Sequence, residues 1–160
     1  DASAYFYFTG LLNLKLRGMG PEKINMFRFS DYGLRSYGNG FVANAAAMQR
    51  ADSMQAFVKA STRGWVEAMA DPKAGAAAVK PREPLANEEI EHERLKLIVE
   101  GSMKTPGTRT HGWGAAIQER LQATIDETVS AFGLKTSPTV ADCWTDRFLP
   151  AAADRKLLVA

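Results

Sequence analysis

Two patterns of hydrophobic and polar residues divide the chain near residue 50. The first 45 residues alternate short β-prone runs, at 2–9, 24–29 and 38–43, with turn residues at 18–21 and 30–33. Between the first two runs, leucines at positions 11, 12, 14 and 16 favour a short helix. The order strand, helix, strand predicts an α/β fold for this part of the chain.

After residue 51 the apolar positions recur at helical spacing. A first helix is predicted from Asp52, which forms a capping-box pattern with Gln55, to the break at Asp71-Pro72. Further helices are predicted at residues 87–100, at 114–132 before a glycine stop, and at about 137–150. The residues predicted to face inward from the first three are Met54, Phe57, Val58, Trp65, Met69, Ile90, Leu97, Ile98, Ile117, Leu121, Ile125, Val129 and Phe132.

The composition is that of one globular domain. Of the 160 residues, 46% are hydrophobic and 24% charged, and the net charge is +2. A chain of this length buries roughly 68–70% of its unfolded surface, so its stability requires neither a disulfide nor a metal. The charges form no basic stripe, so we expect no nucleic-acid partner. No apolar run approaches the roughly 18 residues of a membrane-spanning helix.

Motifs for catalysis and metal binding are weak. Glu89-x-x-His92 has the spacing of carboxylate-bridged metal sites, but it has no second copy and its charged neighbours are typical of a solvated helix face. His111 is interpreted as structural, and Cys143, the single cysteine, as a buried and inert thiol. The Gly-x-Gly at 18–20 lacks the rest of a dinucleotide fingerprint, and the chain has no phosphate-binding loop or Gly-x-Ser-x-Gly elbow.

Residues 31–41 concentrate glycine, tyrosine and small amides. Glycines let a ligand or another backbone approach closely, and tyrosines offer flat apolar faces with a polar tip. In the predicted N-terminal strand, Tyr5 and Tyr7 would face one side, and Phe6 and Phe8 the other. Two interpretations remain open. Either one aromatic pair lines a cleft, or all four side chains belong to the core and the glycines only form turns.

An ordered set of segments across the chain resembles a known family. The first of these segments is the aromatic run after Asp1-Ala2. In their order along the chain, the segments resemble periplasmic solute-binding proteins of ABC importers, in the branch that includes nitrate, sulfonate, taurine and thiamine-pyrimidine binders. The other segments that carry the resemblance are 11–15, 31–33, 37–40, 56–65, 93–97, 112–113, 140–142 and 148–149.

The resemblance implies a two-lobed type II periplasmic binding protein fold that closes around its solute. This chain would be the helix-rich C-terminal half of such a fold. Residues 1–36 are expected to end the second lobe, 37–44 to form the hinge strand that returns to the first lobe, and 45–160 to supply the helical part of the first lobe. Strand edges left unpaired by the start at Asp1 add a fragment dimer to these expectations.

The function implied is that of a solute-binding component without catalytic activity, cofactor or metal. Its partners would be a small polar organic solute or oxyanion and a membrane permease, and its location periplasmic or at the extracytoplasmic membrane surface. The expected ligand-binding residues are Tyr5, Tyr7, Asp31, Tyr32, Tyr37, Gly38 and Asn39.

The resemblance leaves the solute open. In thiamine-pyrimidine binders the equivalent of Tyr7 packs on the ligand ring, but Leu11 stands where those proteins usually carry a glutamate. An oxyanion would instead draw on small polar side chains, here Ser3, Thr9, Ser36 and Asn39. Two other functions are weighed beside the binder: an enzyme similar to the thiamine-pyrimidine synthases of the same fold, and a helical interaction domain.

Overall fold

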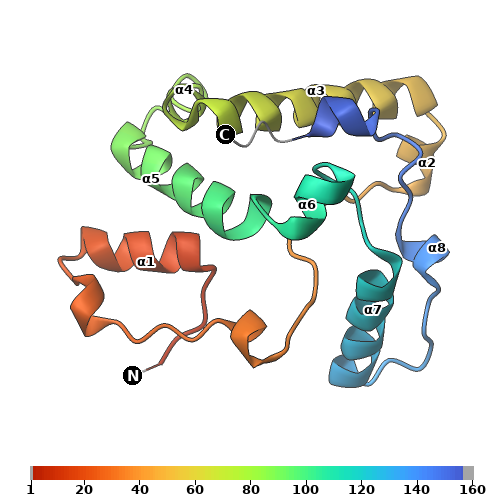
Figure 1. Cartoon of the computed structure of the whole chain (residues 1–160), viewed down its shortest axis with the longest axis horizontal. Coiled ribbons are helices and arrows are strands. Elements are labelled where there is room, and N and C mark those ends of the chain that lie inside the picture. The colour runs from red at the N-terminus through yellow and green to blue at the C-terminus, as the bar shows by residue number, and fades with distance from the viewer. Residues whose placement is uncertain (1, 157–160) are drawn as a thin grey trace.

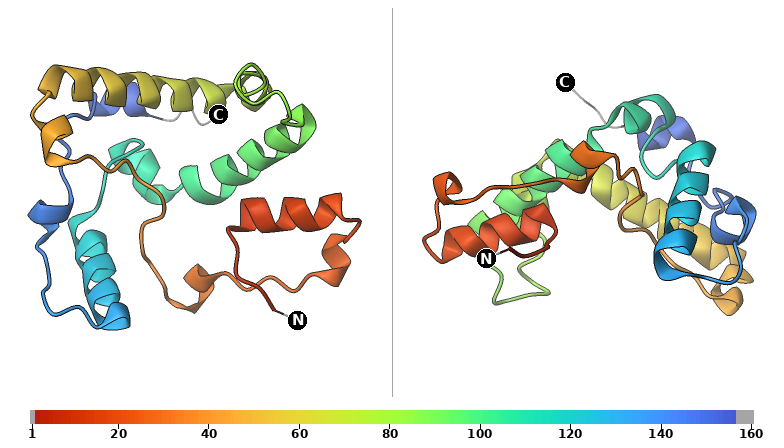
Figure 2. Two further views of the ribbon diagram at one scale, coloured as in Figure 1. Left: turned by 180° about the vertical axis from the view of Figure 1, so that it is seen from behind. Right: turned by 90° about the horizontal axis from the view of Figure 1, so that it is seen from below.

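The computed structural model describes residues 2–156, which form helices joined by extended segments (Figure 1). The long helix α3 lies along one edge with the C-terminal turn η4 against it, and α4 leads the chain into α5. Helix α1 packs on α5, while α7 and α8 lie on the other side of the molecule (Figures 1 and 2). The bounds are α1 Tyr7–Leu16, η1 Pro21–Lys23, η2 Phe29–Tyr32, α2 Ala45–Met48, α3 Ala51–Ala70, α4 Pro72–Ala77, α5 Glu88–Ile98, η3 Val99–Met103, α6 Pro106–His111, α7 Gln118–Phe132, α8 Val140–Cys143 and η4 Ala152–Arg155.

The predicted end of a helix at Asp71-Pro72 is confirmed, and a short helix that was not predicted, α4, follows at once. Helix α3 ends at Ala70, and the carboxylate of Asp71 accepts hydrogen bonds from the backbone N–H groups of Lys73 (3.1 Å) and Ala74 (3.0 Å). Pro72 occupies the first turn of α4, where its missing N–H is not needed. Aspartate and proline together therefore end one helix and start the next.

The start of α3 differs from the prediction. Its N-cap is Arg50, which gives no side-chain hydrogen bond, and the predicted capping box of Asp52 and Gln55 is wrong. Asp52 lies inside the first turn, where its charge interacts favourably with the positive end of the helix dipole. Phe57, which was predicted to face inward, is 50% exposed and packs edge-on against Phe41, whereas Thr62, which was not predicted to face inward, is buried.

Helices α3, α4 and α5 approach one another closely around Gly75. A Cβ atom at Gly75 would lie 2.9 Å from the side chains of both Ala68 in α3 and Leu95 in α5, so only glycine fits without displacement. Helix α5 begins as predicted, because the side chain of Asn87 accepts hydrogen bonds from the next helical N–H groups. The absence of a side chain at Gly75 thus allows α4 to pack closely against both α3 and α5.

The α/β class is not confirmed, because residues 2–156 contain no strand. The strand predicted at 2–9 is wrong, since α1 begins at Tyr7, and residues 24–28 and 38–43 are extended without a ladder partner. Helix α1 buries Leu12 almost completely and is joined to α5 by an ion pair between Lys15 and Glu93 (2.7 Å). This packing outweighs the local β propensity of the aromatic run, a preference that depends strongly on context. The assignment of segments to two lobes stays a prediction.

The last two helices are shorter than predicted. Helix α7 starts at Gln118 rather than 114, buries Ile125, and stops as predicted at Gly133, whose φ is +60°. Phe132, predicted to face inward, is 78% exposed. Helix α8 covers only Val140–Cys143 of the predicted 137–150, because the backbone becomes extended at Trp144.

Cys143 occupies the end of α8 and is exposed, so its prediction as a buried thiol is wrong. Helix α8 begins with a capping box between Thr139 and Asp142, in which each side chain binds the backbone N–H of the other. Hydrogen bonds from the hydroxyl and then the backbone N–H of Thr139 lower the pKa of the Asp142 carboxyl below its ordinary value of 3.8.

Candidate functional site

Tyr7 is half-buried and joins the start of α1 to the end of α5. Its hydroxyl donates a 2.6 Å hydrogen bond to the Leu97 carbonyl and lies 3.3 Å from the hydroxyl of Ser102. The Arg28 guanidinium lies over the ring, 5.1 Å from its centroid. A side chain at Gly101 would collide with the Tyr7 hydroxyl. Both the polar tip and one face of this tyrosine are therefore engaged within the protein.

Tyr37 is likewise half-buried, but against α7. Its hydroxyl oxygen accepts a 2.8 Å hydrogen bond from the backbone N–H of Ile117, just before the helix begins. The Arg120 guanidinium lies 4.2 Å from the centre of the Tyr37 ring and donates to the carbonyls of Arg35 (2.5 Å) and Ser36 (3.0 Å). These contacts fasten residues 35–37 to α7.

The other predicted ligand-binding residues lie on the surface. Tyr5 and Tyr32 are 65% and 73% exposed, and the Tyr32 ring lies 6.3 Å from that of Phe27. Asp31, Gly38 and Asn39 are exposed as well. The structure therefore divides the predicted set into two tyrosines that are anchored to different helices, Tyr7 to α5 and Tyr37 to α7, and five exposed residues.

Two of the side chains considered for an oxyanion already have protein partners. The Thr9 hydroxyl accepts a 3.4 Å hydrogen bond from the guanidinium of Arg94, and the Ser36 hydroxyl donates 2.7 Å to Glu127. Ser3 and Asn39 are exposed. The four residues are thus in different surroundings, and their use as one oxyanion site stays a prediction.

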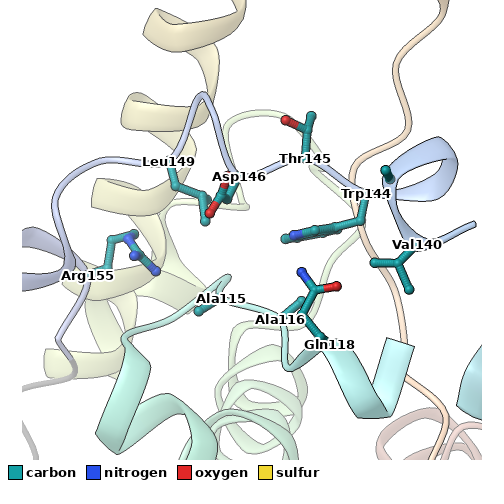
Figure 3. A pocket seen from close by; sticks show the side chains of 10 residues that line it. Ala115, Ala116, Gln118, Val140, Trp144, Thr145, Asp146, Leu149 and Arg155 are labelled. Carbon is teal, nitrogen blue, oxygen red and sulfur yellow. The ribbon is translucent and has the colours of Figure 1, made fainter. Parts of the chain in front are cut away.

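The structure contains a hollow that the sequence did not indicate. It has a volume of about 270 Å³ and lies between the start of α7, the residues around α8, and η4. Figure 3 shows the side chains of Gln118, Trp144, Asp146 and Arg155 around it. No predicted ligand-binding residue lines it. Its residues come from separate parts of the chain and share no spacing motif, so local sequence patterns could not reveal it.

Arg155 is the buried charged residue of this hollow, with 7% of its surface exposed. Its Nε donates to the Pro150 carbonyl and its Nη1 to the Trp113 carbonyl, both at 2.8 Å. In return, the backbone N–H of Trp113 donates to the Arg155 carbonyl at 2.8 Å. The Trp113 ring also lies 6.0 Å from the Trp65 ring of α3. The arginine is thus held firmly in place by backbone carbonyls.

A second, more open hollow of about 420 Å³ lies beside α2 and the start of α3. Its lining includes Arg147 and Phe148, and the Arg147 guanidinium lies 4.4 Å from the centre of the Phe148 ring. The same guanidinium donates 2.7 Å to the Met48 carbonyl. These contacts attach the chain after α8 to α2, which is a structural role.

No group of three or more histidine, cysteine, aspartate or glutamate side chains within residues 2–156 is arranged to hold a metal ion. In the same described part, no helix is both long and apolar enough to cross a membrane. His92 lies half-buried in α5, and the neighbouring Glu91 and Glu93 bind Arg94 and Lys15 respectively. Those acidic side chains therefore act in ion pairs of the helix surface.

Comparison with known proteins matches the N-terminal part of the chain to a family model. Residues 1–75 match the family model described as NMT1/THI5 like, whose domain is found in ABC transporter solute-binding proteins and in thiamine synthase-like proteins. The matched range includes all seven predicted ligand-binding residues and ends within α4. No curated protein and no solved structure matches the chain. The match supports the substrate-binding family broadly.

Proposed function

We propose that the chain is the solute-binding component of an ABC transporter. In this role it captures a small polar organic solute or an oxyanion and delivers it to a membrane permease on the extracytoplasmic side. The observation that carries the proposal is the family match over residues 1–75, which spans Tyr5 through Asn39 without interruption. The proposed arrangement retains two lobes, with residues 37–44 as the connection between them.

The contacts of the two anchored tyrosines suggest how the site is built. Tyr7 holds the N-terminal part to α5, and Tyr37 holds the connecting segment to α7. Between these anchors, Asp31 presents a carboxylate and Tyr32 a flat aromatic face to solvent. A Cβ atom at Gly38 would meet nothing within 4 Å, so a solute can approach the backbone there. We therefore propose that Tyr7 and Tyr37 position the site and that Asp31, Tyr32 and Gly38 contact the solute, assisted by Tyr5 and Asn39.

A thermal-shift screen of the full 160-residue chain tests this proposal. The panel contains pyrimidines, sulfonates, taurine, nitrate and flavins. A ligand at 100 times its dissociation constant adds about 2.7 kcal/mol of stability, which such a screen detects readily. A shift confined to one chemical class is expected, and a flat panel on the folded chain would overturn the proposal.

Two variants locate the binding surface. Tyr32→Ala removes a 73% exposed ring inside the matched range and is expected to abolish the shift. Phe132→Ala removes a 78% exposed ring outside that range and is expected to retain it. Because the family domain also occurs in thiamine synthase-like proteins, the bound compound is recovered and analysed. Recovery of the compound unchanged supports the transporter function. Conversion of the compound to a product would show instead that the chain is an enzyme.

A further inference from the structure

The hollow around Arg155 combines opposite charges that do not pair with each other. Asp146 is exposed at the rim of the hollow, and no ion pair within 4.0 Å joins its carboxylate to Arg155 in the described part of the chain. Figure 3 shows the Arg155 guanidinium and the Asp146 carboxylate on the same side of the hollow. An arginine that is 93% buried without a carboxylate partner is unusual, because burial of a charge is costly unless it is compensated.

The guanidinium retains donors for a ligand. Arginine carries five N–H groups, and the carbonyls of Pro150 and Trp113 engage Nε and one hydrogen of Nη1. Within residues 2–156, the hydrogen bonds of the guanidinium come from Nε and Nη1, and none joins Nη2 to a protein atom. A planar group with two parallel donors suits a carboxylate, which accepts such pairs in a bidentate manner.

The remaining lining adds an apolar surface and polar groups. Trp144 is half-buried and directs the nitrogen end of its indole into the hollow, with the Gln118 amide next to it (Figure 3). Leu149 contributes a further apolar side chain. The volume of about 270 Å³ lies just below the range of roughly 300–1,000 Å³ for drug-sized ligands, so a small metabolite fits better than a large one.

From this combination we propose that the hollow binds a small zwitterionic amino acid. Its carboxylate binds Arg155, its ammonium group binds Asp146, and its side chain packs against Trp144 and Leu149. The site lies entirely beyond residue 75, where the family match ends, so it is distinct from the solute site proposed above. It does not depend on that proposal.

Matched ligands test the need for both charges. The full chain is titrated calorimetrically with L-leucine, with 4-methylpentanoate, which lacks the amine, and with 3-methylbutylamine, which lacks the carboxylate. Leucine is expected to bind at least about tenfold more tightly than either analogue, since each loses one charge-assisted interaction. Glycine and L-phenylalanine test the size of the site. Failure of all three amino acids to bind, or equal affinity for leucine and an analogue, would overturn the proposal.

Variants assign the two ends of the ligand. Asp146→Asn is expected to weaken the binding of leucine at least about tenfold, because the contact with its ammonium group is lost. The affinity for 4-methylpentanoate, which has no amine, is expected to change by less than about twofold. Asp154→Asn is the control, since Asp154 is an exposed acid next to Arg155 that does not line the hollow. Equal effects of the two variants on leucine would contradict the proposal. Tyr32→Ala, which tests the solute site, is expected to leave leucine binding unchanged. Loss of leucine binding in this variant would mean that leucine binds at the solute site and not in the hollow around Arg155.

Discussion

The hydroxyl of Tyr7 donates a 2.6 Å hydrogen bond to the carbonyl of Leu97, and this bond connects the start of α1 to the end of α5. Just after Leu97 the helix widens into the π-helical segment η3, in which the N–H of Lys104 donates to the carbonyl of Val99, five residues earlier. A π-helical turn replaces the regular i to i+4 hydrogen bonds with i to i+5 hydrogen bonds. The Tyr7 hydroxyl donates to α5 directly before this turn, so α1 is fixed to α5 by a polar contact as well as by packing.

Tyr7→Phe is expected to lower the free energy of unfolding by about 1–2 kcal/mol. The substitution retains the ring but leaves the partly buried Leu97 carbonyl without the hydroxyl donor. Urea denaturation measures the change. Tyr5→Phe serves as the control, because Tyr5 is 65% exposed and should change stability by less than about 0.5 kcal/mol. Equal effects of the two substitutions would refute the role assigned to Tyr7.

Leu12→Ala is expected to destabilise the chain by about 2–5 kcal/mol, since Leu12 is 1% exposed and its loss leaves a cavity beneath α1. Leu16→Ala in the same helix is expected to have little effect, because Leu16 is 61% exposed. Thermal and urea unfolding of both variants provide the comparison. A similar small loss in each would mean that α1 is not docked on α5 in solution.

Two glycines are expected to respond to alanine with opposite signs. Gly133 ends α7 at a φ of +60°, so Gly133→Ala should destabilise the chain by about 1 kcal/mol. Gly64 lies inside α3 with nothing within 4 Å of an added Cβ, so Gly64→Ala should stabilise it by up to about 1 kcal/mol. Stabilisation by Gly133→Ala would show that α7 does not end in the left-handed conformation observed.

The capping box of α8 predicts a dependence on pH. The pKa of Asp142 is lowered in the folded chain by hydrogen bonds from the Thr139 hydroxyl and N–H, so these contacts stabilise α8 above the unfolded value of 3.8. That stabilisation is lost as the pH falls through the lower folded pKa. An NMR titration of Asp142 is expected to give a midpoint below 3.8 that rises in Thr139→Val.

Thr128→Val is the control for this titration, because the Thr128 hydroxyl donates to the carbonyl of Thr124 in α7 and does not contact Asp142. It should leave the midpoint of Asp142 unchanged. A midpoint at the ordinary value in the wild-type chain, or an equal change in both threonine variants, would show that the capping box does not persist in solution.

Three helix boundaries were predicted correctly from the sequence, whereas the starts of α3 and α7 and both ends of α8 were not. Asp71-Pro72, Asn87 and Gly133 all act where predicted, because capping and left-handed turns depend on a residue and its immediate neighbours. Which side chains of α7 are buried was predicted less well at the end of the helix. Phe132 fits the helical spacing but is 78% exposed, since no element among residues 2–156 covers its side chain.

In the candidate sites, too, local features were predictable from the sequence and contacts between distant residues were not. The sequence identified the family resemblance and the aromatic segment at residues 31–41, and the match over residues 1–75 supports that family broadly. It could not show that Tyr7 and Tyr37 are anchored to different helices, because their partners lie ninety and eighty positions away. The hollow around Arg155 had no local signal at all, since its arginine is held by the carbonyl of Trp113, forty-two residues distant.

By itself the sequence determined the helical period of the C-terminal two thirds and the helix boundaries at Asp71-Pro72, Asn87 and Gly133, since these depend on interactions within one or two turns. Only the tertiary structure decided the conformation of the first 45 residues. Their aromatic runs favour strands locally, but a strand is stable only beside a partner, and residues 2–156 provide α5 and α7 as packing surfaces instead. The location of buried charge was likewise a tertiary outcome, because the Arg155 guanidinium binds the carbonyl of Trp113, forty-two residues away, as well as that of nearby Pro150.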